Sequence, residues 1–178
     1  MMRKVILGVA VSLDGFIEGP NGEYDWCPPP SKTEMDDFMD KIDAILMGRK
    51  SFELMGPNAF PGKKVYVFSN SLKKAEDENT VLMSGDIVTK MKEIKEQPGK
   101  DIWLFGGASL TTTFLNEQLI DEMWLGLVPI VLGAGKPLFQ NIHQRKLFSL
   151  KEVSEKGGYV SLTLQAKRQE EKKSTKRV

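Results

Sequence analysis

The sequence is poor in the residues that form disulfides and metal sites. Its 178 residues include one cysteine, Cys27, and one histidine, His143. A single cysteine cannot form an intramolecular disulfide, so a reducing cytoplasm is the expected location. One thiol and one imidazole cannot complete a zinc site of the usual nitrogen and sulfur ligands. We therefore expect no metal, a buried or half-buried Cys27 thiol, and His143 in a surface loop.

The sequence also lacks long apolar runs and an excess of charge of one sign. No uninterrupted apolar stretch reaches about 18 residues, which argues against a membrane-spanning helix. Lysine and arginine number 25 against 24 aspartate and glutamate, so the overall charge gives no indication of nucleic-acid binding. The first residues, "MMRKVILGVAVSLDG", contain no small-residue cleavage site and predict a strand. We expect neither a membrane nor a nucleic-acid partner.

Length and composition predict one domain. A chain with 40% apolar residues can bury a core of ordinary size, and it shows no internal repeat. We expect a folded domain over residues 1–168. The basic end of the chain, "QEEKKSTKRV", predicts a disordered tail over residues 169–178, with a nucleic-acid arm as the alternative.

Strands and helices alternate through the middle of the chain. Apolar, β-branched runs predict strands near residues 4–13, 44–47, 64–69, 81–84 and 101–107, and from residue 122. Helical spacing predicts helices near residues 33–42, 50–55, 87–94 and 109–117. Two final alternating runs, 147–153 and 159–166, surround "SEKGG" and predict an antiparallel hairpin. This order predicts an α/β fold with a mostly parallel mixed sheet.

Three of the predicted strands end in small and hydroxyl-bearing residues: glycine and serine at 48–51 and 106–109, and serine at 69–71. In an open α/β sheet, ligands bind outside the carboxyl ends of the strands, where helix N-termini present unpaired N–H groups. Arg49 and Lys50 fall in a predicted first helical turn, where cations oppose the helix dipole. Their position is explained if they bind an anion, and phosphate is the obvious one.

The standard glycine patterns of nucleotide-binding loops are missing. "GGASL" lacks the third glycine of the dinucleotide fingerprint, and "GAGKPL" does not fit the P-loop pattern. "FSNSLKK" instead places hydroxyls, an amide and two lysines at a strand end. An acidic residue there would favour a free ribose hydroxyl, whereas a polar and basic cluster suits a 2′-phosphate. The sequence therefore predicts NADPH rather than NADH.

Five motifs, in their order and spacing, resemble the dihydrofolate reductase fold: "VAVSLDGFI", "LMGRKSFE", "VFSNSL", "WLFGGASL" and "PIVLGAGKPLF". The resemblance spans roughly residues 1–167 and is to the branch containing the C-terminal reductase domain of the bifunctional riboflavin-biosynthesis deaminase/reductase. It implies a three-layer fold with about eight strands, bound NADPH, and hydride transfer to a pterin- or pyrimidine-like heterocycle. It also suggests a homodimer through "LVPIVLGAG", whose alternative is a loop packed on the sheet.

The resemblance implies a set of cofactor-binding residues. Those around the phosphates, including the 2′-phosphate, are Gly48, Arg49, Lys50, Ser51, Ser69 and Asn70. Those around the pyrophosphate and nicotinamide are Gly106, Gly107, Ala108, Ser109 and Leu110, with Ala10 and Ile17 against the nicotinamide. Structural alternatives remain open, because Arg49 could form only a surface ion pair and the two adjacent glycines could serve only a tight turn.

Acidic residues are the candidates for substrate binding and proton delivery. Dihydrofolate reductases hold the pterin with a carboxylate on the first helix, and Glu34 and Asp36 flank the apolar stripe of that predicted helix. Asp14, in "SLDG", is the third candidate, with a turn-forming role as its alternative. A water held by any of the three could deliver the proton. Trp26 either lines the substrate site or covers the core.

The hypothesis from the sequence is an NADPH-dependent reductase resembling the 5-amino-6-(5-phosphoribosylamino)uracil reductase of riboflavin biosynthesis. The zinc deaminase that accompanies this reductase in the bifunctional enzyme has no counterpart, because the chain contains no cysteine pair and no His-x-Glu sequence. Dihydrofolate is the alternative substrate. A nucleotide-binding module without turnover is the alternative function.

Overall fold

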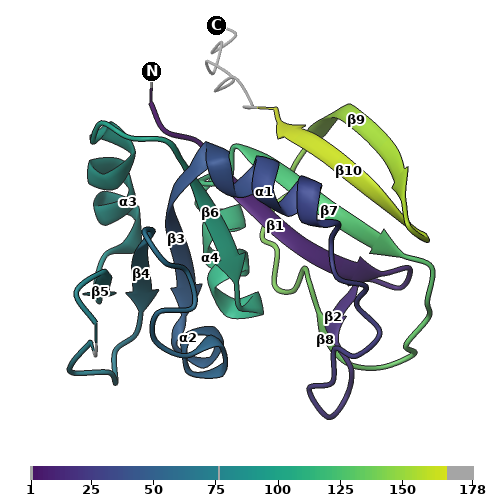
Figure 1. The fold of residues 1–178 in the computed structure, drawn as a ribbon, viewed down its shortest axis with the longest axis horizontal. Coiled ribbons are helices and arrows are strands. Elements are labelled where there is room, and N and C mark those ends of the chain that lie inside the picture. Colours follow the sequence, from purple (N-terminus) through teal and green to yellow (C-terminus); the bar gives the residue numbers. More distant parts are fainter. Residues whose placement is uncertain (1, 76, 168–178) are drawn as a thin grey trace, which may run out of the picture.

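The computed structural model describes residues 2–75 and 77–167, so the predicted tail at 169–178 lies outside the described residues. Its framework is an eight-stranded sheet in the order β5-β4-β3-β6-β1-β7-β10-β9 (Figure 1). The strands are β1 (Val5–Ser12), β3 (Ile42–Gly48), β4 (Lys64–Phe68), β5 (Thr80–Met83), β6 (Asp101–Gly106), β7 (Glu122–Val128), β9 (Phe148–Lys156) and β10 (Tyr159–Ala166). All pairs from β5 to β7 are parallel, whereas β10 is antiparallel to both of its neighbours. The predicted mixed, mostly parallel sheet with a C-terminal hairpin is confirmed.

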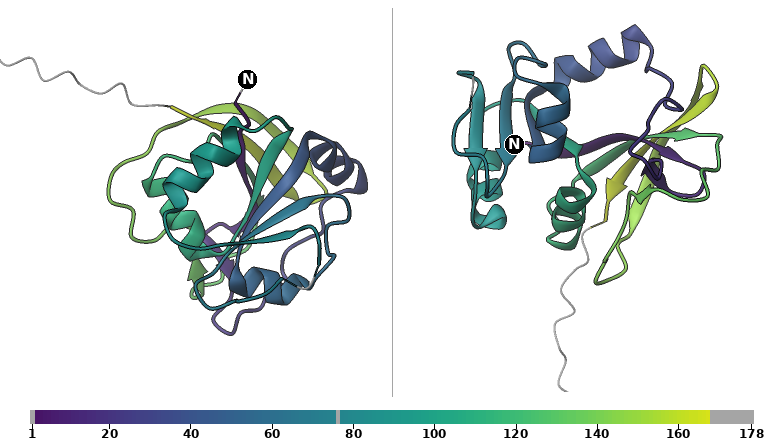
Figure 2. Two further views of the ribbon diagram at one scale, coloured as in Figure 1. Left: turned by 90° about the vertical axis from the view of Figure 1, so that its left-hand side faces the viewer. Right: turned by 90° about the horizontal axis from the view of Figure 1, so that it is seen from below.

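Helices cover both faces of this sheet (Figure 2), which confirms the three-layer prediction. They are α1 (Lys32–Lys41), α2 (Arg49–Met55), α3 (Ile87–Glu96) and α4 (Ala108–Asn116). On one face, Met91 of α3 and Phe114 of α4 share a buried cluster with Leu7 of β1. On the other, Phe38 of α1 packs edge to face on Trp103 of β6, with ring centroids 5.3 Å apart. Within the described residues, no helix is long and apolar enough to cross a membrane.

The alternation of large and small residues along β1 decides what lies on its two faces. Val5, Leu7 and Val11 point into the cluster beneath α3 and α4, because successive side chains of a strand alternate between faces. Gly8 lies on the α1 side, and the Trp103 indole covers it. Nε1 of Trp103 donates to the Gly8 carbonyl at 3.1 Å, and a Cβ on Gly8 would lie 2.7 Å from that nitrogen. The Trp103 side chain therefore occupies the space beside Gly8 on the α1 side of β1.

Two features differ from the sequence prediction. A second sheet pairs β2 (Phe16–Glu18) with β8 (Lys136–Pro137), in antiparallel orientation. Strands this short contain too few residues to show a period of two. The helix predicted to reach Ile42 ends at Lys41, and Ile42 is the wholly buried first residue of β3. The apolar side chain of Ile42 fits both the helical spacing and the buried strand, so the predicted end of the helix is one residue too late.

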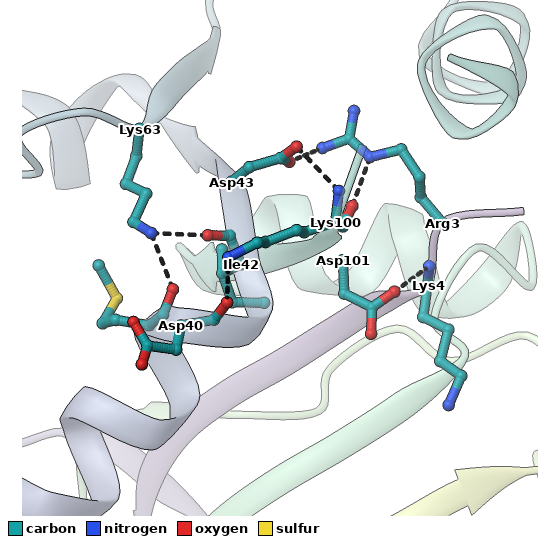
Figure 3. Close-up of polar contacts among 9 residues, drawn as sticks. Arg3, Lys4, Asp40, Ile42, Asp43, Lys63, Lys100 and Asp101 are labelled. Atoms are coloured by element: carbon teal, nitrogen blue, oxygen red, sulfur yellow. Dashed lines mark hydrogen bonds and ion pairs between the residues drawn. The ribbon is translucent and has the colours of Figure 1, made fainter. Parts of the chain in front are cut away.

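Polar contacts join the amino-terminal ends of β1, β3 and β6 (Figure 3). Arg3 forms an ion pair with Asp43 and donates through Nε to the Lys100 carbonyl at 2.6 Å. The other oxygen of Asp43 accepts from the Lys100 amide at 2.8 Å, and Asp101 accepts from the Lys4 amide at 2.9 Å. These contacts hold the three strands in register at one end of the sheet. The candidate site lies at the other end.

Candidate functional site

A groove of about 740 Å³ opens at the carboxyl ends of β3, β4 and β6. Strands that run parallel bring these ends to one edge of the sheet, where ligand sites of α/β folds lie. The volume is in the range typical of small-molecule sites. The predicted cofactor-binding residues that line the groove are Gly48, Arg49, Lys50, Ser51, Ser69, Asn70, Gly107, Ala108, Ser109 and Leu110. The structure thus brings the three predicted strand ends around one hollow.

Three of the predicted cofactor-binding residues do not line this groove. Gly106 is the buried last residue of β6. Ala10 lies in β1 opposite Gly126 of β7. Ile17 lies in β2, half-buried, and packs against the cluster beneath α3 and α4. A contact of these residues with the nicotinamide stays a prediction.

One wall of the groove is the start of α2. Its N-cap residue is Gly48, which offers no side chain to the helix N-terminus. Nη1 of Arg49 lies 2.9 Å from each oxygen of the Glu53 carboxylate, one turn along the helix. The surface ion pair that was the alternative for Arg49 is therefore present. Both side chains are nearly half exposed, and exposed pairs contribute little, so an anion in the groove can replace Glu53 as the partner of Arg49.

The facing wall is the turn from β6 into α4. Gly106 and Gly107 have φ angles of 114° and 90°, which glycine adopts far more readily than other residues. No side chain caps α4, so its first-turn N–H groups are available to a ligand in the groove. A Cβ on Gly107 would lie 3.5 Å from the hydroxyl of Ser51. The two glycines thus form the tight turn, and one of them also faces the groove.

The third wall is the turn after β4. Oγ of Ser69 accepts hydrogen bonds from the amides of Ser71 and Leu72, at 3.1 and 3.0 Å. These bonds fold the turn and hold the exposed Asn70 beside the groove. Lys73 and Lys74, also in the predicted 2′-phosphate cluster, are exposed and do not line the groove.

The sequence interpretation missed the fourth wall. Glu18 of β2, Tyr24 and Lys136 of β8 line the groove opposite the strand ends, and Nζ of Lys136 lies 3.5 Å from Oε2 of Glu18. The available signal was a lysine within the glycine-rich "GAGKPL". Among the residues that the structure describes, Arg49, Lys50 and Lys136 are the cations that line the groove, against one acid, Glu18. This balance favours an anionic ligand.

Asp14 lies in a network that serves the chain itself. Its Oδ1 accepts from the Ser12 hydroxyl at 2.6 Å, and its Oδ2 accepts from the amides of Leu132 and Gly133, at 3.1 and 2.7 Å. The bond from Ser12 lowers the pKa of Asp14, and the bonds from Gly133 and Leu132 act in the same direction. A carboxyl with a lowered pKa is ionised near neutral pH and so has no proton to donate. This geometry favours the structural alternative for Asp14.

The two acids of α1 have different surroundings. Glu34 is half-buried, and its Oε2 accepts from the Ser31 hydroxyl at 2.9 Å and from the Tyr159 hydroxyl at 3.1 Å. Asp36 is exposed to solvent. Trp26 is half-buried and donates through Nε1 to the Glu23 carbonyl at 3.3 Å, outside the groove. Of the predicted substrate-side residues, Glu34 is the one held by a side chain of another element, Tyr159 of β10.

A second cavity, of about 350 Å³, opens at the opposite end of β1. Its lining includes several cations, but the lining acids already pair with two of them. Lys95 lies 2.5 Å from Asp121, and Lys4 lies 2.6 Å from Glu122. Oδ2 of the half-buried Asp121 also accepts a hydrogen bond from the Val5 amide at 2.8 Å. These contacts join α3 and the start of β1 to the start of β7, so two of the cations have protein partners.

The chain is similar to a known protein family and to individual proteins from other organisms. The profile of the family described as RibD C-terminal domain matches residues 3–162. The chain is 46% identical over 158 residues to the uncharacterized protein YyaP of Bacillus subtilis (strain 168), covering 80% of this chain and 84% of that protein. It is 32% identical over 139 residues to the "Putative dihydrofolate reductase" of Caenorhabditis elegans, covering 70% of this chain and 71% of that protein.

Solved structures share the fold. A "Putative riboflavin biosynthesis protein" from Shewanella sp. PV-4 aligns with a TM-score of 0.81 at 28% identity, covering 94% of this chain and 100% of that one. The Thermotoga maritima diaminohydroxyphosphoribosylaminopyrimidine deaminase/5-amino-6-(5-phosphoribosylamino)uracil reductase aligns with a TM-score of 0.71 at 14% identity. That alignment covers 93% of this chain and 57% of the Thermotoga chain.

Proposed function

The chain belongs to the RibD C-terminal domain family, which has the dihydrofolate reductase-like fold, and from this membership we propose that it is an NADPH-dependent reductase of a pyrimidine- or pterin-like heterocycle. One observation carries the proposal. Residues from three strand ends far apart in the sequence line a single groove with an excess of cations. Such an edge of an α/β sheet suits a dinucleotide with several phosphates.

Different residues of the groove would bind different parts of NADPH. Arg49, Lys50 and Lys136 would neutralise phosphate charge, and the unpaired amides at the start of α4 would donate to phosphate oxygens. Asn70 would lie at the 2′-phosphate, with Ser69 folding its turn. NADPH supplies the hydride when it is bound, and the protein contributes orientation and phosphate anchoring.

The substrate side of the proposal depends on α1. Glu34 is a half-buried carboxylate that another element holds in place, and a carboxylate accepts hydrogen bonds from the N–H groups of an aminopyrimidine. The Thermotoga relative is named for a uracil carrying such amino groups. We therefore favour 5-amino-6-(5-phosphoribosylamino)uracil as the substrate, and a water held beside Glu34 as the proton source.

Dihydrofolate is the second candidate substrate, because one relative at 32% identity is named for that reaction. Its pterin also carries an amino group beside ring nitrogens, so Glu34 suits either molecule. Steady-state consumption of NADPH with each compound in turn separates the two. Consumption with the phosphoribosylaminouracil supports the proposal. Tight NADPH binding without consumption of either compound would instead support a nucleotide-binding module.

We also propose that the protein forms a homodimer through the segment of residues 127–135. Val131 of this segment is 67% exposed, and Leu13, whose amide donates to the Ile130 carbonyl at 2.9 Å, is 56% exposed. Large apolar side chains that lie together on a surface often mark an interface. Light scattering coupled to size-exclusion chromatography should report a dimer for the wild-type protein and a smaller mass for Val131→Asp.

A further inference from the structure

A buried tyrosine of the C-terminal hairpin contacts the first helix. Tyr159 of β10 is 9% exposed and donates from its hydroxyl to Oε2 of Glu34 on α1, at 3.1 Å. Its ring lies over Gly126 of β7. A Cβ on Gly126 would be 3.5 Å from two ring carbons of Tyr159 and 3.8 Å from Cα of Ala10 on β1. The ring thus reaches from the hairpin toward β1 and α1, and Figure 1 shows α1 lying over β1 and β7.

The hydrogen bonds to Glu34 are unevenly divided between its two oxygens. Oε2 accepts from both Ser31 and Tyr159. Among residues 2–75 and 77–167, no donor contacts Oε1. A carboxylate has about four lone-pair positions, so two fixed bonds on one oxygen set the orientation of the group and leave the other oxygen available. An oxygen of an ionised carboxylate can only accept, so its partner must be an N–H or O–H donor.

Tyr159 is suited to act as a permanent donor. Burial raises the pKa of its phenol, and the hydrogen bond to Glu34 raises that pKa further. The hydroxyl therefore keeps its proton throughout the physiological pH range. A second contact also connects α1 with this part of the sheet, because Phe38 packs on Trp124 with ring centroids 4.5 Å apart. The helix thus has an apolar anchor that does not depend on the tyrosine hydroxyl.

We infer that Tyr159 is a positioning residue: it orients the Glu34 carboxylate so that Oε1 accepts a hydrogen bond from an amino group of the heterocycle, and it thereby selects aminopyrimidines over pyrimidines that lack the amino group. The inference rests on the proposed function, since it assigns the heterocycle to the site beside Glu34. Tyr159 acts through Glu34 and need not touch the reacting atoms. The sequence pattern around Tyr159 predicts only a strand.

The test compares the binding of 5,6-diaminouracil and uracil, which differ in two amino groups, by fluorescence titration without cofactor. The wild-type protein should bind diaminouracil more tightly. Tyr159→Phe keeps the ring and removes the hydroxyl, so this preference should fall about tenfold. Glu34→Gln keeps the shape and removes the charge, and the preference should fall similarly. Where turnover is measured, Tyr159→Phe should raise KM for the heterocycle more than it lowers kcat.

Thr80→Val is the matched control. Thr80 is also a buried hydroxyl that donates to a carboxylate, Asp77, at 2.6 Å, but it lies on β5 at the far edge of the sheet. Thr80→Val should therefore lower stability by about as much as Tyr159→Phe but leave the preference for diaminouracil over uracil unchanged. An equal preference in wild type and Tyr159→Phe, or no binding of diaminouracil by wild type, overturns the inference. NADPH binding is measured separately. If the wild-type protein does not bind NADPH, the proposed function is wrong. If it binds NADPH but Tyr159→Phe leaves the preference for diaminouracil unchanged, only the inference about Tyr159 is wrong.

Discussion

Ser51 and Gly107 lie close together where two walls of the groove meet, with the Ser51 hydroxyl 3.5 Å from the position that a Cβ on Gly107 would occupy. One residue belongs to α2 and the other is the N-cap of α4. At this point the groove is bounded by a serine and a bare α-carbon. Phosphate oxygens can therefore approach the backbone amides closely, which a larger side chain at either position would prevent.

Gly107→Ala should weaken NADPH binding and lower stability together. A methyl group would enter the groove, and a φ of 90° costs a non-glycine residue roughly 1–3 kcal/mol. Gly158→Ala is the matched control, since Gly158 has a φ of 95° and open space around its missing Cβ. Both variants should unfold at lower urea concentration, but only Gly107→Ala should lose NADPH affinity in a fluorescence titration. Equal NADPH affinities in the two variants would argue against a role of this turn in binding.

Arg49→Ala should lose about 1.5–3 kcal/mol of NADPH binding, or roughly ten- to a hundredfold in Kd, because a charge-assisted bond to phosphate is removed. The same variant loses only an exposed ion pair with Glu53, so its stability should hardly change. Glu53→Gln is the informative partner variant. It frees Arg49, and its NADPH affinity should equal or slightly exceed that of wild type. If Arg49→Ala binds NADPH as wild type does, Arg49 does not contact a phosphate.

Asn70→Asp should reverse the preference for the phosphorylated cofactor. A carboxylate beside the 2′-phosphate repels it, whereas NADH has no charge at that position. We expect the NADPH Kd to rise at least about tenfold and the NADH Kd to change by less than about twofold, with the NADPH effect shrinking as salt is added. Gln97→Glu adds the same charge at an exposed position after α3 and should alter neither value. Equal weakening of both cofactors by Asn70→Asp would place Asn70 elsewhere on the ligand.

The hydrogen bonds to Asp14 predict that its contribution to stability is lost at acidic pH. Hydrogen bonding, first of all from Ser12, lowers the folded-state pKa of Asp14 below its ordinary value near 3.8. The ionised carboxylate is therefore favoured by folding, and its contribution is present above pH 3.8 and lost as the pH falls through the lowered pKa. In Asp14→Asn, the urea midpoint should be lower than in wild type near pH 6, and the gap should narrow below pH 3.8. A gap that stays constant down to about pH 2 would contradict this assignment.

Much of the fold could be predicted because the signals are local. The boundary between β3 and α2 follows from an apolar run that ends in Gly48, and the start of α4 follows from the paired glycines. Pairing between distant segments could not be predicted. Residues 16–18 meet residues 136–137 in the small sheet, and neither segment has the length or the composition to show it. The missed lysine of the groove, Lys136, lies in that small sheet.

The same distinction applies to the site. The groove residues at the three strand ends were predictable because parallel strands must present their carboxyl ends together. The partner of Glu34 was not, because Tyr159 lies 125 residues away and is apolar over most of its surface. The helical wheel placed Glu34 and Asp36 alike beside the apolar stripe. Only the packing of the hairpin against α1 distinguishes the half-buried Glu34 from the exposed Asp36.

A crystal structure of the protein soaked with NADPH tests the central claim most directly. Electron density is expected for the pyrophosphate in the groove beside Ser51 and Gly107, with the 2′-phosphate at Asn70 and Arg49 turned from Glu53 toward a phosphate. Density for NADPH on another surface, or a groove that stays free of cofactor while the nucleotide binds in solution, would contradict it.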